Sequence, residues 1–144
     1  MSSPNPLVRN RFQVQWGGAR TSFAEVSGLA IEMKTADYRD GNSPEDTSLT
    51  MPGIISHPHL VLKRTVVAKD NDFYNWMNSV QFSSVTRRDV TVELLDSGGN
   101  PVVVWKFINA YPVKLEYSGL ESQNSGPMFE TLQLAYDSMT VVMN

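Results

Sequence analysis

Apolar and polar side chains alternate along much of this chain, as they do in strands that bury one face of a sheet. In residues 11–16, for example, Phe12, Val14 and Trp16 are separated by polar residues. The same period recurs to the end of the chain, and we expect about eight strands. They are predicted in residues 11–16, 20–26, 29–34, 60–65, 90–95, 102–107, 113–117 and 132–136. The pattern therefore predicts a mainly β protein.

Two clusters of turn-forming residues separate some of these segments. Gly17 and Gly18 can adopt the positive φ angles of a tight turn, which predicts a hairpin that joins the first two strands. Residues 96–101 read Asp-Ser-Gly-Gly-Asn-Pro, which is typical of a turn. We expect this turn to join the strands on either side of it in a second hairpin.

Residues 70–81 break the alternation. Their apolar members recur at the spacing of one face of an α-helix, and they are Phe73, Trp76, Met77 and Val80. Asp70 or Asp72 can accept a bond from a free backbone N–H at the start of this helix. We expect one short helix whose apolar face packs on the β core and does not form a ligand site.

Residues 39–58 contain two glycines, three prolines and one asparagine, and they predict a long loop. An apolar patch within it contains Leu49, Met51, Ile54 and Ile55. Long loops in compact domains tend to be functional or to be ordered by a partner. An ordinary surface loop is the alternative, but two adjacent isoleucines favour a contact surface.

Composition limits the class of protein further. A chain of 144 residues has the size of one domain, so we expect a single domain over residues 1–144. Its 12 basic and 15 acidic side chains show no basic excess, so we expect no specific binding of nucleic acid. The chain has no cysteine, so neither disulfides nor thiolate–metal sites contribute.

The residues that catalysis requires are scarce. His57 and His59 flank a proline and could be metal ligands, but no acidic residue lies close to them in the sequence, so two polar side chains at the start of a strand are favoured. No Gly-x-Ser-x-Gly motif is present, and the glycine pairs lack the spacing of phosphate loops. We therefore expect no catalytic residue, no cofactor and no metal, and a protein that is not an enzyme.

Arg87, Arg88 and Asp89 form the most charged short run. Nucleic-acid binding would require more basic groups with interleaved aromatic residues. We interpret the run as a solvated strand entry or as part of a salt bridge between subunits.

The first residues, 1–6, have neither the basic start nor the apolar stretch of a secretion signal. No later run approaches the roughly 18 apolar residues that span a bilayer. We expect a soluble protein without a membrane segment, made in the bacterial cytoplasm.

The order of several short motifs resembles the phage tail tube family, and in particular the inner-tube subunits of extracellular contractile injection systems. The motifs are FQVQWGG at 12–18, FAEVSGL at 23–29, YRDGNSPE at 38–45, MPG at 51–53, LKR at 62–64, DFYNW at 72–76 and RRDVTV at 87–92. Each motif alone is weak. Their order, which extends over nearly the whole chain, makes the resemblance specific.

The resemblance implies a compact β-barrel or sandwich of two packed antiparallel sheets with one flanking helix. It also implies hexameric rings that stack into a hollow inner tube, which carries cargo through its lumen and is driven through a target envelope. The partners would be further copies of the chain, a sheath protein, and the baseplate, hub and cap proteins. Such a phage-tail-like particle can be released from the cell.

We expect residues of the long loop and the basic run to form the contacts between subunits. They are Tyr38, Arg39, Asn42, Pro44, Glu45, Met51, Ile54, Ile55, Arg87 and Arg88. The alternatives are a tube-initiating or baseplate hub protein of the same particle, or a lectin-like β-sandwich that binds a glycan. A metal-dependent hydrolase that uses both histidines is the alternative from the enzyme class.

Overall fold

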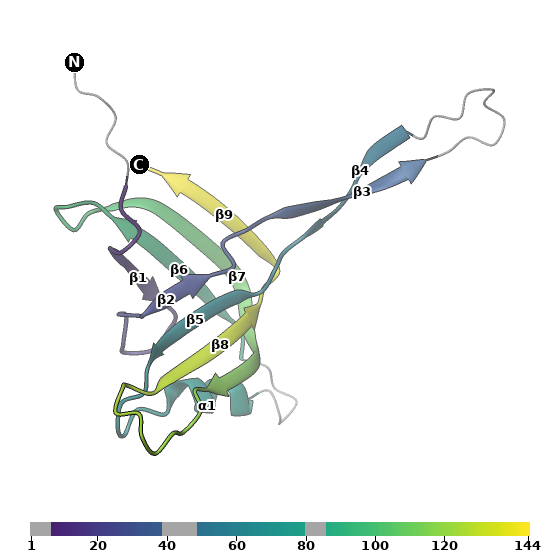
Figure 1. Ribbon diagram of the computed structural model, residues 1–144. Helices are drawn as coiled ribbons and strands as arrows, with labels where there is room; N and C mark the ends of the chain where they lie inside the picture. The colour runs from purple at the N-terminus through teal and green to yellow at the C-terminus, as the bar shows by residue number, and fades with distance from the viewer. Residues whose placement is uncertain (1–6, 39–48, 80–85) are drawn as a thin grey trace.

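The computed structural model describes residues 7–38, 49–79 and 86–144 of the chain. Within these ranges it contains nine strands and one helix (Figure 1). They are β1 (Phe12–Gln15), β2 (Glu25–Ser27), β3 (Glu32–Tyr38), β4 (Leu49–Ser56), β5 (Leu60–Thr65), α1 (Asp72–Ser79), β6 (Arg88–Leu95), β7 (Pro101–Tyr117), β8 (Phe129–Ala135) and β9 (Ser138–Met143).

Strand β7 belongs to two antiparallel sheets. Residues 101–110 of β7 pair with β6, and residues 103–108 also pair with β9. Residues 111–117 pair with β8. The first sheet thus has the order β1-β6-β7-β9 and the second the order β7-β8-β5-β2. The expectation of a barrel or sandwich of two packed antiparallel sheets with one short helix is confirmed.

Asn109 lies where β7 passes from the first sheet to the second. Its φ of 55° is in the left-handed region, which asparagine tolerates better than most residues. Asp89 accepts a hydrogen bond from the backbone N–H of Asn109 at 3.1 Å, and Asp137 accepts one from its side-chain amide at 3.0 Å. Two carboxylates from β6 and from the turn before β9 therefore hold the bend of β7.

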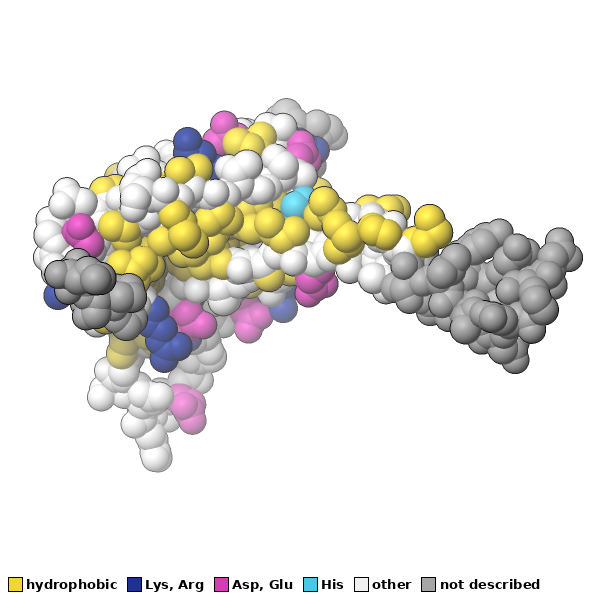
Figure 2. Space-filling view, turned by 90° about the horizontal axis from the view of Figure 1, so that it is seen from above, with side chains coloured by type: hydrophobic (Ala, Val, Ile, Leu, Met, Phe, Trp, Pro, Cys, Tyr) yellow, Lys and Arg dark blue, Asp and Glu magenta, His cyan; other side chains and the backbone are white. Residues whose placement is uncertain are grey.

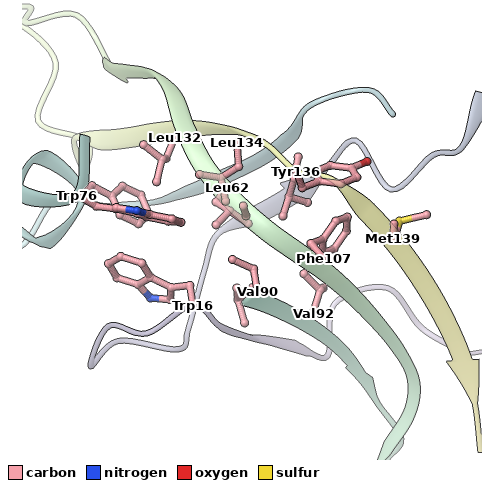
Figure 3. Packing of buried hydrophobic residues seen from close by; sticks show 14 residues of the cluster. Trp16, Leu62, Trp76, Val90, Val92, Phe107, Leu132, Leu134, Tyr136 and Met139 are labelled. Carbon is pink, nitrogen blue, oxygen red and sulfur yellow. The ribbon is translucent and has the colours of Figure 1, made fainter. Parts of the chain in front are cut away.

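The core lies between the two sheets (Figure 3). Alternate residues of both sheets point inward and are fully or almost fully buried; they include Val14, Leu60, Leu62, Val90, Val92, Phe107, Leu132 and Leu134. At one end, Trp16 and Trp76 close the core with their ring centroids 5.9 Å apart. Burial of this apolar surface is the main favourable contribution to folding.

The helix begins two residues later than predicted. The Asp70 carboxylate accepts the backbone N–H of Asp72 at 3.2 Å, so Asp70 satisfies one of the free donors at the start of α1. Phe73 and Trp76 are buried, as the helical spacing predicted. Residues 80 and 81 of the predicted helix lie outside the described residues.

The turn predicted at Gly17 and Gly18 is present, with Gly17 at a φ of 91° and the Val14 N–H donating to the Thr21 carbonyl at 3.0 Å, but the two strands that it was expected to join do not form a hairpin. Strand β1 pairs with β6 and β2 pairs with β5, so the two segments that follow each other in the chain are not partners. The indole N–H of Trp16 donates to the carbonyl of Arg20 at 2.8 Å, and the chain turns around this ring. A Cβ on Gly18 would lie 2.1 Å from the Trp16 ring, so glycine is required there for close packing.

Three other differences concern strand boundaries. The segments 102–107 and 113–117 are parts of the single strand β7, which continues through the bend. Strand β9 was not predicted, because residues 138–143 do not alternate clearly. The predicted long loop is also too long, since residues 49–56 of it form strand β4. The hairpin at residues 96–101 is confirmed, and Asp96 accepts the N–H groups of Gly98 and Asn100 within the turn.

Candidate functional site

Strands β3 and β4 form a two-stranded hairpin that extends away from the body of the molecule (Figure 1). We call this hairpin the arm. Among the described residues, its strands pair with each other and with no other strand. The arm thus exposes backbone N–H and C=O groups along both outer edges, as edge strands do.

The arm also exposes large apolar side chains. Ile54 is 81% exposed, and four others are exposed by half or more: Ile31, Met33, Met51 and Ile55. Figure 2 shows the hydrophobic side chains along the arm and their continuation onto the body. Scattered exposed apolar residues are common, but a contiguous group on a projecting element is typical of an interaction site.

A β-bulge shapes the arm near its base. Met33 lies opposite Ile55, whereas Thr35 lies opposite Pro52, so β4 contains one residue more than β3 between these pairs. The extra residue falls at the Gly53–Ile54 step. Pro52 has no backbone N–H to donate to a neighbouring strand. It is tolerated here because β4 has a free edge.

The segments before β3 and after β4 approach each other closely where the arm meets the body. Gly28 has a φ of 84°, and a Cβ at this position would lie 2.1 Å from the carbonyl oxygen of His59. Only glycine allows both the left-handed conformation and this close approach. The direction in which the arm leaves the body is therefore determined in part by this backbone contact.

His57, which follows β4, packs its ring on Tyr136, with the ring centroids 5.3 Å apart. Tyr136 in turn contacts Phe107 edge to face at 4.8 Å. Burial raises the pKa of Tyr136 above its ordinary value, because the phenolate would be poorly solvated. The contact connects the segment that follows β4 to the core.

Arg88 is half-buried, and its guanidinium lies against aromatic rings of the core. Its guanidinium lies 4.7 Å from the ring centroid of Trp76 and 5.6 Å from that of Trp16. Burial lowers the pKa of Arg88 and the nearby Asp72 raises it, with burial the larger effect. Arg87, by contrast, is exposed and pairs with Asp137 at 3.2 Å. The two neighbouring arginines therefore have different surroundings.

Arg64 is the most deeply buried charged residue that the structure describes, and sequence reasoning did not select it as a site residue. Its Nε lies 2.6 Å from a carboxylate oxygen of Glu130, and both side chains are almost fully buried. Asp70 lies 3.4 Å from a second nitrogen and also pairs with Arg20 at 3.2 Å. This network connects β5, β8 and the start of α1.

The described residues bring no set of catalytic groups together. No three histidine, aspartate or glutamate side chains among them are grouped as metal ligands. His59 is exposed, whereas His57 lies against Tyr136. No helix in the described ranges has both the length and the apolar character needed to cross a membrane.

The predicted contact residues fall into three groups. Met51, Ile54 and Ile55 lie on β4 with exposed side chains, and Tyr38 ends β3. Arg39, Asn42, Pro44 and Glu45 lie outside the described residues. Arg87 and Arg88 lie at the start of β6, away from the arm, and make the contacts within the chain that are described above.

Comparison with solved structures finds close matches over the whole chain. A structure of the anti-feeding prophage cap, described as its tube terminating cap, has a TM-score of 0.89 and 27% identity, with 100% of this chain and 95% of that chain covered. The sheath-tube complex of the PVC extracellular contractile injection system in its extended state has a TM-score of 0.86 and 26% identity, with coverage of 96% and 93%.

A third structure, the sheath/tube terminator of the same PVC system, has a TM-score of 0.87 and 26% identity, with coverage of 98% and 99%. A search of curated proteins found no match. The family model for the T4-like virus tail tube protein gp19 matches residues 8–140.

The fold, the exposed arm and these similarities define a β-rich structural protein of phage-tail-like assemblies. Because the family model covers nearly the whole chain, this protein belongs to the family of the T4-like virus tail tube protein gp19.

Proposed function

We propose that this chain is the repeating subunit of the inner tube of a contractile injection particle. In this proposal, copies of the chain form hexameric rings, the rings stack into a hollow conduit, and cargo passes through the lumen. The chain has no catalytic role of its own. The particle is assembled in the bacterial cytoplasm and released from the cell.

The apolar arm is the observation on which the proposal depends. Exposed side chains such as Ile54 and Ile55 gain about 25 cal/mol for each Å² of apolar surface that a partner covers. A tube subunit has identical neighbours at fixed positions, so each arm can be covered by another copy. The predicted contact residues Tyr38, Met51, Ile54 and Ile55 lie on this arm.

The edges of the first sheet support a ring. Among the described residues, β9 is paired on one side, with β7, and exposes Val141, Val142 and Met143. At the other end of the sheet, β1 has β6 as its strand partner. A head-to-tail arrangement of copies pairs one edge with the next, and a closed ring leaves no edge free.

Partners follow from the similar structures. The PVC structure is a complex of sheath and tube, so we propose a sheath protein around the tube. The anti-feeding prophage and PVC structures also include a cap and a terminator, so we propose that one end of the tube contacts such a protein. A baseplate or hub protein at the other end is proposed from the resemblance to contractile injection systems.

Electron microscopy of the purified full-length protein tests the proposal. We expect rings or tubes of uniform diameter that become more abundant as the protein concentration rises. A protein that remains monomeric at every concentration, by microscopy and by analytical ultracentrifugation, would refute the role as a tube subunit.

A tube terminator is the second candidate, because the match to the anti-feeding prophage cap is as close as the match to the PVC tube. A tube-initiating hub protein of the same fold is a related possibility. Copy number separates these roles from a tube subunit. Quantitative mass spectrometry of the intact particle should find this chain in a number that grows with tube length, whereas a terminator or initiator is present at a fixed and small number.

A further inference from the structure

We propose that the loop of residues 118–128, which we call the basal loop, receives the apolar root of the arm of a second copy in the adjacent ring. This inference rests on the proposed function, because it names the surface that covers the arm root when rings stack. We define the arm root as Ile31, Met33, Ile54 and Ile55.

The β4 side of the arm root requires an uncharged partner surface, whereas on β3 the exposed Glu32 and Lys34 flank Met33. Strand β4 contains no charged residue from Leu49 to Ser56, and its most exposed apolar side chain is Ile54. A charged group that was buried against this strand would lose its hydration without a counterion, which is costly. The complementary surface should therefore be apolar and nearly free of charge.

The basal loop has these properties. It surrounds an open hollow of about 810 Å³ whose lining includes Leu120, Pro127, Met128 and Phe129. Leu120 is 85% exposed, more than any other described large apolar side chain. Glu121 is the one charged residue between Ser118 and Phe129. When a partner binds, Leu120 can bury its own exposed surface, and the hollow beside it can admit a side chain such as Ile54.

Hydrogen bonds within the basal loop fix its shape before any partner binds. At its neck, the Ser118 N–H donates to the Phe129 carbonyl at 2.9 Å, and the Phe129 N–H donates to the Ser118 hydroxyl at 3.0 Å. At its far end, Asn124 accepts the N–H of Gly126 at 2.8 Å. A preformed loop loses little conformational entropy on binding.

A second hollow of the described surface fits the arm root less well. It has a volume of about 670 Å³ and lies between the chain before β1 and the chain around β2, where Phe12 and Phe23 are partly buried. Arg9 and Glu25 also line it. An uncharged strand that covered this hollow would remove both charged groups from water without pairing them better.

The placement of the two surfaces also favours contact between rings. In Figure 1 the arm leaves the right side of the body and extends to the upper right, whereas the basal loop lies at the lower end of the body. The arm of one copy therefore cannot reach its own basal loop. A second copy can therefore supply the partner surface, and a head-to-tail contact of this kind repeats from copy to copy along a filament.

Cysteine cross-linking tests this contact directly, because the natural chain contains no cysteine. The variant with Ile54→Cys and Leu120→Cys is assembled into tubes and treated with a short bismaleimide. We expect covalent ladders on a denaturing gel, and we expect none from either single variant. A matched control combines Ile54→Cys with Glu25→Cys, which lines the other hollow.

A charge pair provides the second measurement. Ile54→Lys and Leu120→Glu each place an unpaired charge in the proposed contact and should raise the critical concentration for tube formation by about tenfold or more. Both positions are exposed, so thermal unfolding of the monomer should not change. The double variant should return to within about threefold of the natural protein, because the two charges face each other across the ring interface.

The outcomes distinguish this inference from the proposed function. If the natural protein forms no tubes, both are refuted. If tubes form but the Ile54–Leu120 pair gives no ladder, or the control pair gives one in its place, the basal loop is not the receiving surface although the tube role stands. Charge variants that assemble normally, or a double variant that is no better than the singles, would lead to the same conclusion.

Discussion

The guanidinium of Arg64 lies 3.8 Å from the ring centroid of Phe73, inside the core and between the two sheets. Trp16 lies on another side of it at 5.0 Å, and Glu130 supplies a carboxylate at 2.6 Å. The positive charge is therefore balanced by an ion pair and by aromatic faces. Among the described residues, its Nη1 atom has no hydrogen-bond acceptor, so the surrounding rings are a large part of its stabilisation.

The first prediction concerns this buried pair. Glu130→Leu removes the closer and more deeply buried of the two carboxylates that pair with Arg64, and it should reduce the free energy of unfolding by about 3–5 kcal/mol. Arg64→Met should have a similar effect, because it leaves the Glu130 charge alone. The double variant should be much more stable than the sum of the two losses predicts, since no unpaired charge remains. Urea denaturation of the monomer measures all three, and additive losses would contradict the argument.

The second prediction concerns acid stability. Burial raises the pKa of Asp70, but the backbone N–H of Asp72 and the guanidinium groups of Arg20 and Arg64 outweigh burial and lower it. A lowered pKa in the folded state contributes stability that is complete above the ordinary carboxyl range and is lost as the pH falls through the lowered value.

Asp70→Asn should therefore be less stable than the natural protein at pH 7, and this difference should shrink as the pH falls below about 4. Thermal unfolding between neutral and acidic pH measures the effect. Glu121→Gln, the same change of charge on the exposed basal loop, is the matched control and should leave the curve unchanged. A constant difference between Asp70→Asn and the natural protein at every pH would exclude the linkage.

The third prediction concerns the close approach of Gly28 to the His59 carbonyl. Gly28→Ala adds a Cβ that would lie 2.1 Å from the His59 carbonyl and forces a non-glycine residue to a φ of 84°. The free energy of unfolding should fall by more than about 2 kcal/mol. Gly119→Ala is the control, because nothing lies within 4 Å of its added Cβ, and it should change stability by less than about 0.5 kcal/mol. Equal effects of the two substitutions in urea denaturation would show that the Gly28–His59 contact is not tight.

The fourth prediction separates two adjacent arginines. Arg88→Ala removes a cation and an aliphatic stem that lie against the Trp16 and Trp76 rings, and we expect a loss of about 1–2 kcal/mol. Arg87→Ala breaks an exposed pair with Asp137 and should cost less than about 1 kcal/mol. Urea denaturation compares them. If Arg87→Ala impairs tube formation without a loss of monomer stability, it supports a contact between subunits at Arg87, whereas a large loss of stability would assign it to the monomer.

Local signals predicted the parts of the fold that local physics decides. Alternation identified β1, β5 and β6, and the helical spacing of Phe73 and Trp76 identified the buried face of α1. The turn at residues 96–101 was predicted because Asp96, Gly98 and Asn100 form it among themselves. Each of these elements depends on residues that lie close together in the chain.

Contacts between segments that lie far apart in the sequence decided the parts of the fold that were not predicted. Gly17 and Gly18 look like a hairpin turn, but the Trp16 ring occupies the inside of that turn, and the partner of β1 is β6, far along the chain. Strand β9 lacks clear alternation because two of its apolar residues, Val141 and Val142, are adjacent and both exposed. Residues 138–143 form a strand because they pair with β7, and their own sequence pattern does not predict it.

The candidate site was predicted in part. The adjacent isoleucines correctly indicated an exposed apolar segment, but the glycine and prolines there suggested a loop, whereas pairing with β3 makes residues 49–56 a strand. Arg64 alternates in phase with Leu60 and Leu62, so its burial could have been predicted from the sequence. Its partner Glu130 lies 66 residues away, and no local signal connects the two.

A single continuous backbone connects the two sheets, because β7 has 17 residues and contributes to both. Two sheets that meet only through side chains can slide or separate under force, but here any such shear must stretch or unbend a covalent main chain that Asp89 and Asp137 hold at Asn109. A push applied to one sheet is therefore passed to the other through chemical bonds. If the proposed function holds, this continuity would help a hollow rod that is thrust lengthwise to keep its bore open.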